Sequence, residues 1–149
     1  MTPYDMIKAH LETAVPFAAH VGVKLLEIGD GTASAELVQR HETSNHIGTQ
    51  HAGAMFTLGE AASGAAMAGA IAPVIMDMRP VAAMGQITFK KIAEGTLTAH
   101  AKTSRPGSDL LSALQENGKV AFDVAVDIQN EAGETVVEMQ VNWHVSAKR

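Results

Sequence analysis

The sequence predicts a single α+β domain, residues 1–149, in which an antiparallel sheet of five to six strands wraps around a long central helix. Three observations lead to this prediction. A length of 149 residues suits one domain with one core. Residues 52–70 form one run of small and apolar residues with the length of a buried helix. The second half of the chain alternates apolar and polar residues, which is typical of antiparallel strands with one buried face.

The N-terminal part predicts a short helix followed by a hairpin. Residues 4–14 carry apolar side chains near helical spacing, and Pro16 ends that helix. Residues 21–28 and 32–38 are predicted to be strands, joined by a tight turn at Gly29–Gly31. The polar stretch that follows, residues 41–50, is predicted to be a loop.

Glycines distinguish the central helix, residues 52–70. Four of them lie within it: Gly53, Gly59, Gly64 and Gly69. Each interior glycine costs about 1 kcal/mol relative to alanine. This cost is understandable if other backbone segments approach the helix closely, so we expect a helix that is wrapped by strands on nearly every side.

The remainder of the chain predicts four strands and one inserted helix. Pro73 and Pro80 are expected to bracket a connection, and residues 130–134 to form a hairpin turn. A short helix is expected over 109–116, with Ser108 as its N-cap and Gly118 just after its end. The four strands are expected at residues 82–91, 96–104, 120–128 and 135–145.

Composition excludes several classes of function. The net charge is −5 and the basic residues are scattered, which argues against a nucleic-acid partner. The absence of cysteine excludes disulfides and thiol nucleophiles. The N-terminus has no signal-peptide pattern, so we expect a cytoplasmic protein. Residues 52–76 are mostly Ala and Gly, with Glu60 at the centre and Pro73 near the end, so no membrane span is expected.

Glu60 is the candidate that carries chemistry. It is the only charged residue in a long run of small and apolar residues, and a buried carboxylate without a partner is costly. A carboxylate that simply faces water is the alternative. Desolvation would raise the pKa of Glu60, which suits a general base or acid.

Other chemistries fit the sequence poorly. Ser63 lacks the glycine pattern of a nucleophile elbow. His41, His46 and His51 are spaced by five residues in a loop and match no common metal motif, so we expect no metal. No phosphate-binding glycine loop occurs, and we expect no cofactor.

The start of the central helix is a second candidate region. The backbone N–H groups of Ala52 and Gly53 lie in the first turn, where they lack helical partners and can polarise a carbonyl oxygen. Asn45 and His51 precede this turn. Each can be a functional residue or only a turn or capping residue, and the residues alone leave both readings open.

These residues resemble the hotdog-fold acyl-CoA thioesterases, and among them the PaaI-like branch. That family has an Asn, a Gly, a His-Gly-Gly and an acid, with the Asn six residues before the His and the acid nine residues after it. Asn45, Gly48, His51-Ala52-Gly53 and Glu60 keep both spacings. The resemblance extends over essentially the whole chain, and the inserted helix is similar to that of a poorly characterised subgroup of the superfamily.

The resemblance implies roles for these residues in the hydrolysis of an acyl-CoA. Glu60 would be the general base or the nucleophile, and Asn45 would orient the water or the thioester. The amides of Ala52 and Gly53 would polarise the thioester carbonyl, with His51 and Gly48 completing the motif. An acyl-carrier-protein thioester in place of CoA remains open.

The resemblance also implies an assembly. Hotdog subunits pair their sheets edge to edge, and the site combines the Asn and His-Gly part of one subunit with the acid of the other. We therefore expect a homodimer or a homotetramer with sites at subunit interfaces. Lys90, Lys91 and Arg105 are the candidates for binding the CoA phosphates.

The sequence differs from the family motif at two places, and two other functions remain as alternatives to thioester hydrolysis. Ala52 replaces the middle glycine of the motif, and Ala82 and Ala83 stand where some relatives carry a hydroxyl. A non-catalytic acyl-CoA-binding protein is one alternative. The other is a hotdog hydroxyacyl dehydratase, because His46 and Glu60 have its fourteen-residue spacing although its intervening prolines are missing.

The acyl group is not determined by the sequence. Pocket depth would depend on the packing of several large flexible side chains, which could equally belong to the core. These residues are Met55, Phe56, Met67, Met78 and Met84.

Overall fold

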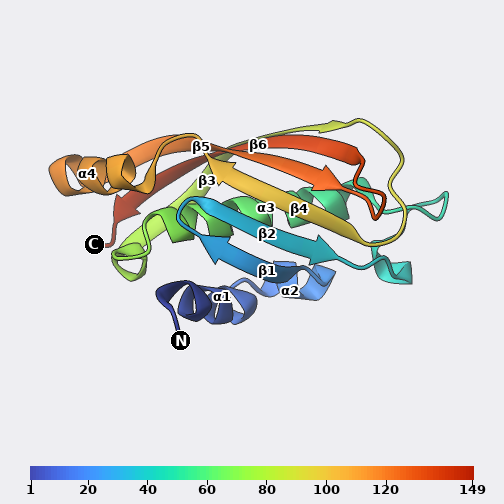
Figure 1. Ribbon diagram of the computed structural model, residues 1–149, viewed down its shortest axis with the longest axis horizontal. Helices are drawn as coiled ribbons and strands as arrows, with labels where there is room; N and C mark the ends of the chain where they lie inside the picture. The colour runs from blue at the N-terminus through green and yellow to red at the C-terminus, as the bar shows by residue number, and fades with distance from the viewer.

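The computed structural model describes residues 1–149, and its strands form one six-stranded antiparallel sheet in the order β1-β2-β4-β5-β6-β3 (Figure 1). The predicted fold class is confirmed. The strands are β1 (Lys24–Gly29), β2 (Thr32–Leu37), β3 (Met78–Phe89), β4 (Leu97–Thr103), β5 (Lys119–Gln129) and β6 (Thr135–Ala147). The helices are α1 (Pro3–Ala14), α2 (Pro16–Val21), α3 (Ala52–Ala70) and α4 (Gly107–Asn117), with 3-10 turns η1 (His41–Thr43) and η2 (Ile75–Asp77).

The central helix α3 has the predicted bounds and lies against one face of the sheet, which curves around it (Figure 1). Thirteen of its residues are buried. Two of its glycines allow the close contacts that the sequence predicts. A Cβ atom at Gly59 would meet the sulfur of Met139, and one at Gly69 would meet the backbone carbonyl oxygen of Gly29.

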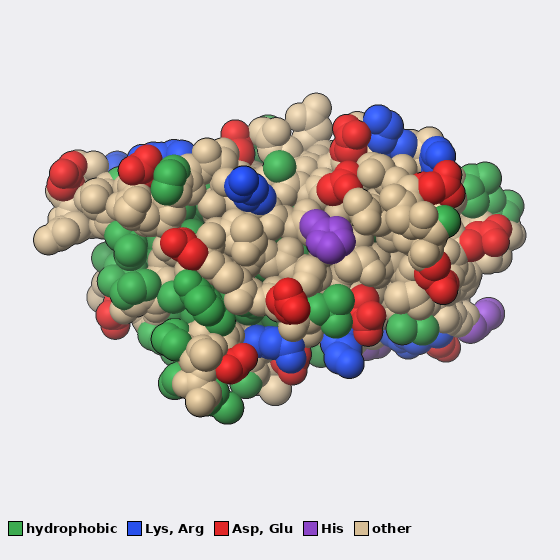
Figure 2. All heavy atoms as spheres, viewed as in Figure 1, with side chains coloured by type: hydrophobic (Ala, Val, Ile, Leu, Met, Phe, Trp, Pro, Cys, Tyr) green, Lys and Arg blue, Asp and Glu red, His purple; other side chains and the backbone are tan.

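The strands of the second half bury alternate residues, as predicted. In β4 the residues Leu97, Ala99, Ala101 and Thr103 are buried, and His100 and Lys102, which alternate with the last three, are exposed. Strands β5 and β6 follow the same alternation. Figure 2 shows acidic and basic side chains interspersed over the face that carries β2 and β4, without a cluster of one sign.

Three predicted boundaries are wrong. A strand was expected from Val21, but that residue ends α2, a helix that begins at Pro16 and closes at Gly22 with a φ of 99°. Pro80 lies inside β3, which a proline tolerates because β3 is an edge strand. Helix α4 begins one residue before Ser108, with Pro106 at the N-cap.

Strand β3 differs from the other long strands because none of its twelve residues is buried. It pairs with β6 along its whole length and leaves its other edge open. Gly85 and Phe89 pair with Val141 and Val137, two buried residues of β6, so β3 continues the apolar face of the sheet, where α3 covers it only sparsely. Val81 and Met84 are each about half exposed, at 52% and 50%.

The two N-terminal helices cover the side of α3 that lies beyond β1 (Figure 1). Leu11, in α1, packs against the core, and Ile7 is part of it. Helix α4 projects at one end of the molecule, held by buried Leu110 and Leu114. No helix has both the length and the hydropathy of a membrane-crossing segment.

Candidate active site

One stripe of α3 stays open although the rest of the helix is buried. The residues of this open stripe are Ala52, Gly53, Phe56, Glu60, Ala61 and Gly64. Their spacing of three to four residues puts them on one helical face. The ring of Phe56 lies over Gly85 of β3, where an added Cβ would meet it. The prediction of a helix wrapped on nearly every side is therefore only partly correct, and the open stripe carries the one charged side chain of α3.

Glu60 lies half-buried on the open stripe, and its carboxylate has no hydrogen bond or ion pair within the chain. Burial raises the pKa of Glu60 above the ordinary value for a glutamate. No neighbouring charge contributes to this shift. The carboxylate is thus desolvated and uncompensated, as the sequence predicts for a functional acid or base.

Glu60 borders an apolar cavity of about 210 Å³, here called the Glu60 cavity. Ten of the fourteen residues that line it are hydrophobic, and none is Lys, Arg or His. Residues of α1, α2 and α3 make up most of the lining, and Leu25 of β1, Pro80 of β3 and Trp143 of β6 complete it. The lining residues are Leu11, Glu12, Val15, Ala18, Ala19, Val23, Leu25, Glu60, Ala61, Gly64, Ala65, Met67, Pro80 and Trp143.

Ser63 and Trp143 hold the turn of α3 that carries Glu60. The Ser63 hydroxyl donates to the backbone carbonyl of Glu60 at 2.7 Å and accepts from the indole Nε1 of Trp143 at 3.0 Å. The Ser63 side chain is fully buried, so substrate cannot reach it and its role is structural. The Trp143 ring also lies against Gly64, whose missing side chain leaves room for it.

His51 is the N-cap of α3. Its Nδ1 atom accepts a hydrogen bond of 2.8 Å from the backbone N–H of Gly53. The backbone N–H of Ala52 is exposed and has no acceptor in the chain. Of the two amides that the sequence predicts for carbonyl polarisation, one is therefore free and the other is engaged by His51.

Asn45 organises the turn before α3. Its Oδ1 atom accepts from the backbone N–H groups of Ile47 and Thr49, and its Nδ2 atom donates to the Thr49 hydroxyl at 2.8 Å. Gly48 completes the turn with a φ of 77°, a left-handed conformation that favours glycine. Both ends of the Asn45 side chain are thus used within the turn.

The structure does not bring the two halves of the predicted site together within one chain. His51 and Gly53 line a separate hollow of about 360 Å³, together with residues of α2 and the η1 turn. This second hollow shares no lining residue with the Glu60 cavity. Glu60 lies nine positions after His51 in the chain, which is about 13 Å along the axis of α3.

The predicted phosphate-binding residues differ in their surroundings. Lys90 pairs with Glu138 at 3.1 Å and Lys91 with Glu134 at 2.6 Å, all at the surface. Arg105 is half-buried as a residue and makes no ion pair. Among the large side chains expected to set pocket depth, Met67 lines the Glu60 cavity and the other four do not.

Sequence reasoning missed the residues of the N-terminal helices that line the Glu60 cavity. It also missed Arg40, whose guanidinium donates to the backbone carbonyls of His20 and Val21 at 2.8 and 2.6 Å. A signal for α2 was present, since Pro16 and Gly22 have the spacing of a short helix with proline at its start and glycine after its end. The contact between Arg40 and α2 has no such local signal.

Comparisons with known proteins agree with this architecture. The family described as a domain of unknown function, DUF4442, matches residues 4–145. No curated protein matches the chain. A crystal structure from Pseudomonas aeruginosa, described as a protein of unknown function and probable thioesterase, is 21% identical with a TM-score of 0.79, covering 99% of this chain and 97% of the other.

Two further structures are similar in fold. A mutant of a thioesterase from Staphylococcus aureus is 17% identical with a TM-score of 0.73, covering 89% of this chain and 99% of its own. A hypothetical thioesterase from Streptococcus pneumoniae, crystallised with coenzyme A, is 18% identical with a TM-score of 0.71, covering 95% of this chain and 98% of its own. The chain belongs to the DUF4442 family and has the hotdog fold that it shares with these thioesterase structures.

Proposed function

We propose that this protein hydrolyses an acyl-CoA thioester to the free acid and CoA. The observation that carries the proposal is the Glu60 carboxylate, which is half-buried, unpaired and placed beside an apolar cavity on the open stripe of α3. The fold shared with structures described as thioesterases, one of them crystallised with coenzyme A, supports it. Membership of the PaaI-like branch stays a prediction.

Glu60 acts as the general base in this proposal. Its carboxylate removes a proton from water as the water oxygen bonds to the thioester carbon. The tetrahedral intermediate then collapses, the carbon–sulfur bond breaks, and the thiolate of CoA takes the proton. If Glu60 were instead the nucleophile, an acyl-Glu60 anhydride would form first and water would cleave it afterwards.

The first turn of α3 stabilises the negative charge on the carbonyl oxygen. The Ala52 amide is free to donate, and the positive end of the helix dipole lies there. The Gly53 amide becomes a second donor when the carbonyl oxygen replaces His51 Nδ1 as its acceptor. Asn45 contributes by holding the turn that precedes this amide pair.

The working unit in this proposal is a homodimer or a homotetramer built from such dimers. The open edge and the exposed apolar face of β3 provide the surface for edge-to-edge pairing. The separation of Glu60 from His51 and Asn45 within one chain supports a site completed by a neighbouring subunit. Arg105, and Lys90 and Lys91 after release from their acidic partners, are the candidates for the CoA phosphates.

One observation favours a second function, binding of acyl-CoA without catalysis. The Gly53 amide is engaged by His51, so only one of the two predicted donors is free in the chain. The dehydratase alternative lacks such support, because His46 is exposed on the turn that Asn45 organises and does not line the Glu60 cavity.

Release of free thiol from a panel of acyl-CoA esters tests the proposal. We expect hydrolysis by the native protein and a loss of at least about 100-fold in kcat for Glu60→Gln, the scale of a lost general base. Glu116→Gln, at an exposed position of α4 away from the Glu60 cavity, is the matched control. Binding without hydrolysis would support the second function, and hydration of an enoyl-CoA without thiol release would support the dehydratase. In ¹⁸O-labelled water, a single turnover that labels Glu60 would identify it as the nucleophile.

A further inference from the structure

The volume of the Glu60 cavity and the charges of its lining residues indicate which class of ligand it can hold. We propose that it holds the acyl group of the thioester and accepts uncharged acyl or aryl groups of up to about eight carbon atoms. The inference rests on the proposed function for the identity of the ligand. It rests on the cavity itself for the size and the charge of that ligand.

The size follows from the volume. An apolar protein cavity of about 150 Å³ binds benzene, which has six carbon atoms. At the same packing, the 210 Å³ of the Glu60 cavity holds a group of about eight carbon atoms. A hexadecanoyl chain would extend well beyond it.

The charge preference follows from the lining. The cavity has two carboxylates, Glu12 and Glu60, and no basic side chain. Glu12 pairs with Lys8 at 3.2 Å, but Lys8 does not line the cavity. An acyl group with a second carboxylate would be desolvated there without a cation, which is costly. The acid product, once ionised, would also be repelled by Glu60, which favours its release.

The Glu60 cavity exists because several of the residues that line it have small side chains. Ala18 and Ala19 of α2 and Ala61 and Ala65 of α3 all line the Glu60 cavity. Larger side chains at these positions would fill it. The distance between α2 and α3 therefore decides how large an acyl group fits.

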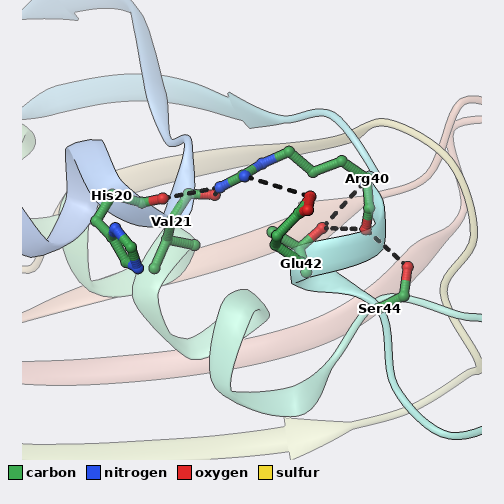
Figure 3. Close-up of polar contacts among 6 residues, drawn as sticks. His20, Val21, Arg40, Glu42 and Ser44 are labelled. Atoms are coloured by element: carbon green, nitrogen blue, oxygen red, sulfur yellow. Dashed lines mark hydrogen bonds and ion pairs between the residues drawn. The ribbon is translucent and has the colours of Figure 1, made fainter.

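Arg40 is a positioning residue for the α2 wall. Figure 3 shows its side chain extending from the segment just before η1 to the carbonyls of His20 and Val21 at the last turn of α2. The same side chain lies 3.7 Å from Glu42, which orients it. Gly22 ends the helix with its backbone close to Arg40. These contacts fix the C-terminal end of the helix that carries Ala18 and Ala19.

Binding of S-alkyl-CoA thioethers, which cannot be hydrolysed, tests the size limit on the full chain. Each buried methylene group is worth about fourfold in affinity. We expect the dissociation constant measured by calorimetry to fall at least tenfold from ethyl-CoA to octyl-CoA. It should not fall further for hexadecyl-CoA. An ω-carboxyheptyl-CoA thioether should bind at least tenfold more weakly than octyl-CoA.

Two variants should move the limit in opposite directions. Ala18→Leu fills the cavity and should remove most of the preference for octyl-CoA over ethyl-CoA. Leu11→Ala enlarges the cavity and should extend the preference beyond eight carbons. Ala9→Leu, at an exposed position of α1 outside the Glu60 cavity, is the control and should change neither.

The outcomes separate this inference from the proposed function. Alkyl-CoA binding with the expected chain-length pattern, but without hydrolysis of any acyl-CoA, would overturn the proposed function and keep the acyl site. Hydrolysis with a chain-length profile that neither variant moves would keep the function and overturn the acyl site. Equal binding of ethyl-CoA, octyl-CoA and hexadecyl-CoA would also overturn it.

Discussion

The Nδ1 atom of His51 accepts the backbone N–H of Gly53 at 2.8 Å, so the side chain that begins α3 occupies a donor that a substrate carbonyl would need. A capping bond of this kind stabilises the helix when no ligand is bound. In the proposed mechanism it also keeps the Gly53 amide satisfied until a carbonyl oxygen replaces the imidazole. His51 therefore links the stability of α3 to the availability of its amide.

Replacing His51 should separate these two effects. We expect His51→Ala to lower the free energy of unfolding by about 1 kcal/mol, the usual cost of a lost N-cap, and to leave kcat within about threefold because the Gly53 amide remains. Urea unfolding and thiol release measure the two quantities. His46→Ala, at an exposed histidine of the same loop that caps no helix, is the control. A 100-fold loss of kcat in a stable variant would show that the imidazole itself acts on the substrate.

The stability of the protein should depend on pH through Glu60. Because burial raises the pKa of Glu60, the native state binds this proton more tightly than the unfolded chain does. The resulting stabilisation is complete below the ordinary glutamate pKa of 4.5 and is lost as the pH rises through the raised value.

Glu60→Gln removes this effect. We expect the variant to be more stable than the native protein at pH 8, by about 0.5–1 kcal/mol, and the difference to disappear near pH 4. Thermal unfolding at several pH values measures it. A variant that is less stable than the native protein at pH 8 would mean that Glu60 has a favourable partner in the folded state.

Ser63 should matter for stability more than its size indicates. Ser63→Ala would leave the buried Nε1–H of Trp143 without an acceptor, which costs about 1–3 kcal/mol. Urea unfolding would measure the loss, with Ser112→Ala at an exposed position of α4 as the control. Because Ser63→Ala removes the hydroxyl that accepts the hydrogen bond of the Trp143 indole, we also expect a shift in the tryptophan fluorescence of the folded protein. Equal stability of the two variants would contradict this account.

Arg40 should control the order of α2. Arg40→Gln removes two hydrogen bonds from a charged donor to carbonyls of α2, and we expect a loss of about 1–2 kcal/mol. Hydrogen exchange should become faster in residues 16–21 but not in α3, and the preference for eight-carbon groups should weaken. Arg149→Gln, at an exposed arginine without an ion pair beyond the end of β6, is the control. Unchanged exchange in α2 would show that other contacts hold this helix.

The open edge of β3 should be an interface between copies of the chain. We expect the native protein to sediment as a dimer or tetramer and Met84→Lys to shift it toward the monomer, because a lysine on an edge strand opposes further pairing. Ala121→Lys, on the interior strand β5, is the control. If subunits share the site, activity should fall with the dimer fraction. A fully active monomer would contradict the shared site.

The regular elements could be predicted because their signals are local. The run of small residues predicts α3, and the alternation of apolar and polar residues predicts β4, β5 and β6. Both patterns are visible within a short stretch of sequence, and the structure confirms these elements. Helix α2 was missed because Val21 and Val23 favour a strand by propensity. The proline and glycine that bound α2 outweigh this preference over only six residues.

The candidate site was only partly predictable. The isolation of Glu60 among small residues is visible in the sequence, and so is the amide pair at the start of α3. The wall of the Glu60 cavity is not, because Leu11 and Trp143 meet there from opposite ends of the chain. Nor does the sequence show that His51 engages Gly53, since a histidine before a helix can cap it or leave it free.

The contact between Gly69 and Gly29 has a consequence for how the protein admits a ligand. At its C-terminal end α3 touches the backbone of the β1–β2 turn, and Gly107 of α4 packs against the carbonyl of Ala70 just beyond. Backbone against backbone leaves the helix no room to slide or tilt at that end. We therefore expect the space beside Glu60 to widen by movement of α1 and α2, which line its other side, and not by movement of that end of α3. On this account the N-terminal helices act as the adjustable part of the entrance.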